Sequence, residues 1–103
     1  MILTGQNFIG SERTGMGRNN FRAVNPATGD LLPISFYEAT EAEVGSAVLK
    51  AEAAFQEYKE QSSEDRALFL EAIGDELWAL GDELIERCMS ETALPAARLN
   101  GER

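Results

Sequence analysis

The sequence has no histidine, one cysteine and three prolines among its 103 residues. Without histidine, the chain by itself can build neither a histidine-based catalytic triad nor a histidine metal site. The single cysteine, Cys88, excludes an internal disulfide and makes a reducing compartment the simpler expectation. No apolar run approaches the roughly 20 residues that a membrane-spanning helix needs, and residues 1–5 do not resemble a signal peptide. We therefore expect a cytoplasmic protein that does not span a membrane.

Positive charge is also scarce, with 9 Lys and Arg against 18 Asp and Glu, for a net charge of −9. Residues 1–37 are nearly balanced, so the acidic excess belongs to residues 38–103. Because the electric field of an acidic protein repels phosphate backbones, the sequence predicts no nucleic-acid partner.

The first part of the chain has the pattern of short strands. Segments 8–9, 21–24 and 31–37 predict a three-stranded antiparallel patch, and residues 10–20 predict a loop between strands. Within 31–37, period two predicts one shared face for Leu32, Ile34 and Phe36. The glycines of Gly15-Met16-Gly17 are not placed between a strand and a helix, so no phosphate-binding loop is predicted there.

The pattern changes to helix at Thr40, which forms a predicted capping box with Glu43. Helices are expected over about 41–60 and about 63–89, and a further one is expected to start at about 95–103. Gly81 predicts a bend or a joint within the second helix. The fold class predicted from these patterns is α+β, with short antiparallel strands followed by two to three amphipathic helices.

The second helix carries more apolar residues than the rest of the chain can cover. Phe69, Trp78 and Leu84 are expected to remain exposed, and so to drive self-association that Leu84→Asp would weaken. Cys88 lies on the same apolar stripe and is interpreted as a small packing residue rather than a nucleophile.

Several segments, in order, resemble the N-terminal region of the NAD(P)-dependent aldehyde dehydrogenase superfamily. The strand and turn Val24-Asn25-Pro26-Ala27-Thr28-Gly29-Asp30 resembles its "NPATG" segment. The other matching segments are Phe8-Ile9-Gly10, Glu38-Ala39-Thr40 with Glu43-Val44 and Ala47-Val48, Arg66-Ala67 with Leu70 and Ile73, and Glu91-Thr92 with Pro95. A narrower resemblance, to α-ketoglutaric semialdehyde (2,5-dioxovalerate) dehydrogenases, is visible in residues 21–26, 79–82, 84–87 and 97–103.

The resemblance implies an N-terminal segment of a larger α/β enzyme that uses NAD or NADP to oxidise an aldehyde to an acid. In that family a cysteine thiolate attacks the aldehyde, a glutamate is the general base and the nicotinamide takes the hydride. The corresponding residues lie beyond a segment of this kind. The resemblance therefore implies no catalytic or cofactor-binding residue in residues 1–103, and no cofactor for this chain alone.

One site is implied within the chain itself. Many family members hold a structural monovalent cation, and the matching positions here are Ala23, Val24 and Glu91. A solvated Glu91 near a helix end is the competing interpretation. Ala93 stands where the family usually has glycine, which puts the local backbone conformation in question.

Two classes of function remain open from the sequence. The first is a segment of an aldehyde dehydrogenase that contacts the rest of its parent or a second copy of itself, in an enzyme expected to be a homo-oligomer. The alternative is a free-standing acidic helical module that binds a partner protein through its apolar face.

Overall fold

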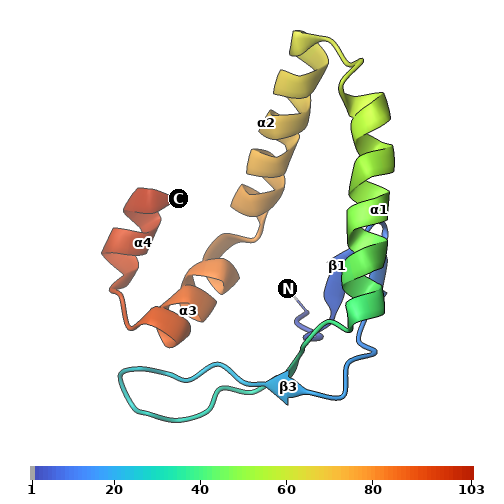
Figure 1. The fold of residues 1–103 in the computed structure, drawn as a ribbon. Helices are drawn as coiled ribbons and strands as arrows, with labels where there is room; N and C mark the ends of the chain where they lie inside the picture. The colour runs from blue at the N-terminus through green and yellow to red at the C-terminus, as the bar shows by residue number, and fades with distance from the viewer. Residues whose placement is uncertain (1) are drawn as a thin grey trace.

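The computed structural model describes residues 2–103 and shows an α+β chain (Figure 1). Its elements run in the order β1 (Asn7–Ile9), β2 (Glu12–Thr14), β3 (Asn20–Phe21), β4 (Phe36–Tyr37), α1 (Glu41–Tyr58), α2 (Ser63–Ala79), α3 (Gly81–Thr92) and α4 (Ala96–Glu102). None of the helices described is long and apolar enough to cross a membrane.

The strands form two separate antiparallel pairs, so the predicted three-stranded patch is wrong. β1 pairs with β2, with Phe8 opposite Arg13, and β3 pairs with β4, with Phe21 opposite Phe36. Segment 8–9 therefore pairs within its own hairpin, and residues 12–14 form a strand where a loop was predicted. The left-handed φ of +62° at Gly10 explains this, because it allows the chain to reverse immediately after Ile9.

Residues 31–37 do not form one continuous strand either. Leu31 makes an isolated bridge with Val24, and regular pairing resumes only at Phe36. Ile34 has a positive φ of 78°, which breaks the period-two alternation. The predicted common face of Leu32, Ile34 and Phe36 is therefore wrong. Pro33, which cannot donate to a ladder, lies in this irregular stretch.

The start of α1 confirms the predicted capping box. The Thr40 hydroxyl accepts from the Glu43 N–H at 3.1 Å, while Glu43 Oε2 accepts from the Thr40 N–H at 2.8 Å. The same carboxylate reaches the loop after β2, where its Oε1 accepts from the Met16 N–H at 3.2 Å. Glu43 thus joins α1 to the strand region.

The segment predicted as one helix over 63–89 is divided into α2 and α3. The break is at Gly81, whose φ is +61°, a conformation that ends helical hydrogen bonding at small cost only for glycine. The second part, α3, continues to Thr92. Leu84 thus lies in α3, where it is half-buried rather than exposed, which contradicts its predicted exposure. Phe69 and Trp78 in α2 are exposed, as predicted.

The chain is extended, with dimensions of 48 × 37 × 18 Å. Its radius of gyration is 17.0 Å, whereas a compact domain of 100 residues has about 13 Å. Its accessible surface is 7887 Å², about 2,200 Å² more than a compact monomer of this mass exposes. Only two apolar side chains among the described residues are buried, Ile9 and Ile85, at 7% and 6% exposure. The apolar faces of the helices are therefore mostly uncovered.

Candidate functional site

The turn at residues 23–32 is held by hydrogen bonds from its own backbone and side chains. Asn25 is the central residue: its carbonyl accepts from the Gly29 N–H at 2.7 Å and its Oδ1 from the Ala27 N–H at 2.9 Å. Gly29 has a φ of +80°, which suits glycine. The Arg22 guanidinium donates from Nε to the Leu32 carbonyl at 2.7 Å and so ties the two sides of the loop together. The turn is thus locally specified.

The residues of the predicted cation site already have protein partners. The Ala23 carbonyl accepts from the Leu32 N–H at 2.8 Å, and Val24 bridges to Leu31. Glu91 lies in the last turn of α3, where its Oε1 accepts from Arg87 Nε at 2.6 Å. The described residues contain no cluster of three or more His, Cys, Asp or Glu that could hold a metal ion. A monovalent cation at Ala23, Val24 and Glu91 stays a prediction.

Arg87 connects α3 to the strand region. Its guanidinium carbon lies 5.8 Å from the centre of the Phe36 ring, and its side chain is only 18% exposed. Its Nη2 is buried without a hydrogen-bond partner among the described residues. A buried guanidinium nitrogen normally has an acceptor, so this donor is available to a group that the described residues do not supply.

The structure shows the backbone conformation of Ala93, which follows the last residue of α3. Ala93 has φ 59° and ψ 15°, the left-handed conformation that commonly closes a helix, and its N–H donates to the Met89 carbonyl at 2.9 Å. The position therefore has the backbone conformation that glycine adopts most easily, and alanine occupies it at a cost.

Cys88 lies half-buried in a hollow of about 350 Å³ between the end of α2, α3 and α4. The walls are mainly apolar, with Leu77, Trp78 and Leu99 among them. Arg103 covers the Trp78 ring at 4.1 Å and donates to the Trp78 carbonyl at 2.9 Å. With no histidine in the chain, Cys88 has no imidazole base beside it. Its surroundings are those of a packing residue, as predicted.

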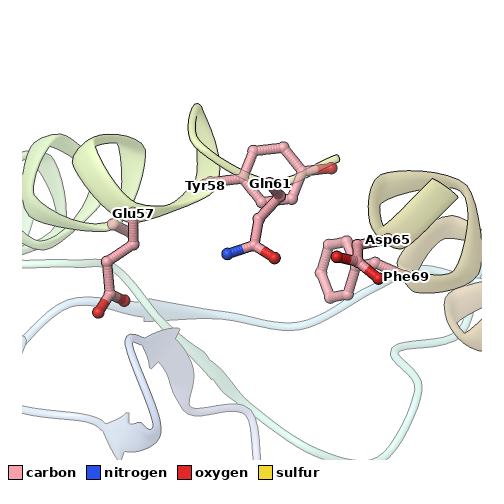
Figure 2. A pocket seen from close by; sticks show the side chains of 6 residues that line it. Glu57, Tyr58, Gln61, Asp65 and Phe69 are labelled. Carbon is pink, nitrogen blue, oxygen red and sulfur yellow. The ribbon is translucent and has the colours of Figure 1, made fainter. Parts of the chain in front are cut away.

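A second hollow, of about 350 Å³, lies where α1 meets α2 (Figure 2). Its base is formed by Tyr58 and Phe69, whose rings meet edge to face with centroids 5.8 Å apart. Figure 2 shows Glu57, Gln61 and Asp65 spread along it rather than aimed at one point. No nucleophile, convergent acid–base pair or phosphate-binding loop lines it.

Two connections between distant segments were not anticipated from the sequence. A Cβ on Gly17 would overlap the Glu38 carbonyl, and one on Gly5 would overlap the Ser35 carbonyl. Both glycines thus allow the first segment to approach the β4 region closely. The only sequence signal was the glycine itself, and glycine in a loop has many explanations.

Comparisons with known proteins indicate the family of the chain. A model of the aldehyde dehydrogenase family matches residues 12–102. The chain is 47% identical to alpha-ketoglutaric semialdehyde dehydrogenase 2 of Azospirillum brasilense over 105 aligned residues, covering 100% of this chain and 20% of that protein. It is 33% identical to alpha-ketoglutaric semialdehyde dehydrogenase of Acinetobacter baylyi over 98 aligned residues, covering 95% of this chain and 19% of that protein.

No solved structure shows significant similarity to the chain. The chain spans about a fifth of the length of the curated relatives that it matches. The family model nevertheless covers nearly all of its strands and helices. On these grounds the chain belongs to the aldehyde dehydrogenase family.

Proposed function

We propose that the chain is the N-terminal portion of an NAD(P)-dependent aldehyde dehydrogenase, with α-ketoglutaric semialdehyde as the candidate substrate of its parent. The proposed substrate follows from the two curated relatives, both named for that reaction. In this proposal the catalytic cysteine, the general base and the NAD or NADP site belong to the remaining four fifths of the parent. The chain alone has neither catalytic activity nor a cofactor. The parent is proposed to be cytoplasmic and homo-oligomeric.

The observation that carries the proposal is α2, a helix of 17 residues with no buried residue. Helices in proteins gain most of their stability from packing an apolar face, so a long helix without such packing needs further protein surface. The excess accessible surface, about 2,200 Å², is of the order of what one partner contributes to a large obligate interface. The buried Arg87 Nη2 has no hydrogen-bond partner among the described residues, and further protein surface would supply an acceptor for it. We propose that the remainder of the parent polypeptide, or a second copy of the chain, covers this surface.

The coding frame tests the proposal most directly. It is expected to continue beyond Arg103 into several hundred residues that include a cysteine nucleophile motif. The parent is then expected to reduce NAD or NADP in the presence of α-ketoglutaric semialdehyde. A frame that closes at Arg103 would overturn the proposal and favour the alternative, a free-standing acidic module that binds a partner through its apolar face. A long parent that oxidises only other aldehydes would overturn the substrate alone.

A further inference from the structure

The last turn of α3 carries a negative charge at the helix end where positive charge is favoured. Glu91 lies in this turn, and no Lys or Arg of α3 lies there with it. The carbonyl groups at a helix C-terminus carry partial negative charge as well, so a carboxylate at this end is unfavourable without a nearby cation. The end of α3 therefore needs a positive charge from elsewhere, either a side chain or an ion.

Arg87, one turn earlier in α3, supplies a positive charge to this helix end. Its Nε donates to Glu91 Oε1 at 2.6 Å, a short distance of the kind that charge-assisted hydrogen bonds have. The two side chains are 18% and 39% exposed, so water screens their attraction less than at an open surface. A second pair with the same spacing, Arg98 with Glu102 in α4, is longer, at 3.2 Å, and its side chains are 60% and 62% exposed.

The guanidinium of Arg87 also lies against the strand region. Its carbon is 5.8 Å from the centre of the Phe36 ring, and that ring stacks on Phe21 with the two centroids 5.8 Å apart. A guanidinium over an aromatic face is attracted to it. Arg87 thus connects the end of α3 to the β3–β4 pair, from which the chain enters the turn at residues 23–32.

The predicted cation would connect the same two parts of the chain, because its expected ligands are Glu91 on one side and Ala23 with Val24 on the other. The oxygens of these residues are already engaged. The Ala23 carbonyl accepts from the Leu32 N–H, and Ala23 has no side-chain oxygen. Glu91 Oε1 accepts from Arg87. An ion beside Glu91 would also lie close to the guanidinium, and two positive charges a short distance apart repel each other.

We infer that Arg87 takes the place of a structural cation in this chain. Its guanidinium neutralises Glu91, and the face of Phe36 holds the guanidinium beside the strand region. The chain is therefore expected to need neither Na⁺ nor K⁺ at Ala23, Val24 and Glu91. The role of Arg87 is to fix the end of α3 relative to β3 and β4.

The first test compares thermal unfolding of the chain in NaCl, KCl and tetramethylammonium chloride at equal ionic strength, followed by circular dichroism. Tetramethylammonium is too large for a site built from carbonyl and carboxylate oxygens, so it controls for screening. The midpoint temperature of the unaltered chain is expected to be equal in all three salts. A higher midpoint in NaCl or KCl would show that the chain binds a cation with Arg87 in place, and would overturn the inference.

Removing the guanidinium is expected to create a dependence on cations that the unaltered chain lacks. Arg87→Gln should lower the midpoint in tetramethylammonium chloride by about 5 °C, a shift typical of the loss of one favourable interaction in a domain of this length. Na⁺ or K⁺ should restore part of this loss by binding at Glu91. If Arg87→Gln is unfolded in tetramethylammonium chloride, NaCl or KCl should refold it. An equal state of this variant in all three salts, folded or unfolded, would overturn the inference.

Two further substitutions separate the position of the charge from its amount. Arg87→Lys keeps a positive charge at the same position and should remain insensitive to the choice of salt. Arg98→Gln removes one positive charge from the exposed pair in α4, and it should also show equal midpoints in the three salts. If Arg98→Gln acquires the same preference for Na⁺ or K⁺ as Arg87→Gln, the net charge of the chain explains the effect and the inference is wrong.

The location of the ion in the Arg87→Gln variant is checked by adding Glu91→Gln. Without the carboxylate, NaCl and KCl should have no advantage over tetramethylammonium chloride. A preference for Na⁺ or K⁺ that persists in the double variant would place the ion elsewhere in this acidic chain and would overturn the inference. All these measurements concern the 103-residue chain itself, so their outcome does not depend on the coding frame or on the substrate of the parent.

Discussion

Met16 and Glu43 are 27 residues apart in the chain, and the Met16 N–H donates to Glu43 Oε1 at 3.2 Å. The same carboxylate caps α1 through the Thr40 N–H and is only 6% exposed. Hydrogen bonds to the ionised form, above all from the Thr40 backbone, lower the pKa of Glu43 below its ordinary value of 4.5. One side chain therefore stabilises both a helix end and a long-range connection.

The stability of this junction is expected to depend on pH. Because the folded-state pKa of Glu43 is depressed, its contribution is fully present above about 4.5 and is lost as pH falls through the lower, folded-state pKa. Glu43→Gln should remove that acid dependence and speed hydrogen exchange at the Met16 amide. Thermal unfolding and exchange measured over this pH range check it. Glu41→Gln changes an exposed residue in the same helical turn and should leave the acid dependence of stability and the exchange of the Met16 amide unchanged. If Glu41→Gln has the same effects as Glu43→Gln, those effects come from net charge.

Ala93→Gly is expected to stabilise the chain. Ala93 has a φ of 59°, where an L side chain costs about 1–2 kcal/mol and glycine costs little. After the greater freedom of glycine in the unfolded state is subtracted, the net gain should be about 0.5–1 kcal/mol. Urea unfolding measures it. Ala53→Gly, within α1, should instead destabilise by about 1 kcal/mol. A loss of stability in both variants would contradict the strained conformation at Ala93.

Gly17→Ala is expected to disturb the contact between the first segment and the residues after β4. The added Cβ would overlap the Glu38 carbonyl, which is backbone and cannot rotate away. The loss should exceed 1 kcal/mol, as is typical of overpacking. Gly45→Ala is the matched control, because its Cβ would meet nothing within 4 Å and alanine favours helix by about 0.5–1 kcal/mol. The midpoint temperature of thermal unfolding should fall in Gly17→Ala and rise in Gly45→Ala. Unchanged stability of the Gly17→Ala variant would show that the two segments are not in close contact.

The isolated chain is expected to bind neither NAD nor NADP. It lacks a glycine-rich turn between a strand and a helix, and its one cysteine lies in a mainly apolar hollow with no histidine in the chain to serve as its base. Calorimetry with each dinucleotide should show no heat of binding, and an aldehyde assay should show no reduced nicotinamide. Micromolar binding of either dinucleotide to the chain would contradict this assignment of the cofactor site to the rest of the parent.

The sequence by itself determined the features that depend on neighbouring residues. The capping box of Thr40 and Glu43, the turn centred on Asn25 and the interruption at Gly81 all follow from side-chain chemistry within a few positions. The ordered series of motifs also indicated the family, and the match of the family model to residues 12–102 confirms it.

Only the tertiary structure decided which distant segments meet. Strand pairing depends on chain reversals, so the positive φ of Gly10 and Ile34 replaced one predicted sheet with two short pairs. The separation of α2 from α3 places Leu84 in a half-buried position and leaves Ile73 and Leu77 exposed on α2. Local patterns specify which residues are apolar, but the direction in which an apolar face points depends on the helix break before it and on the element that covers it.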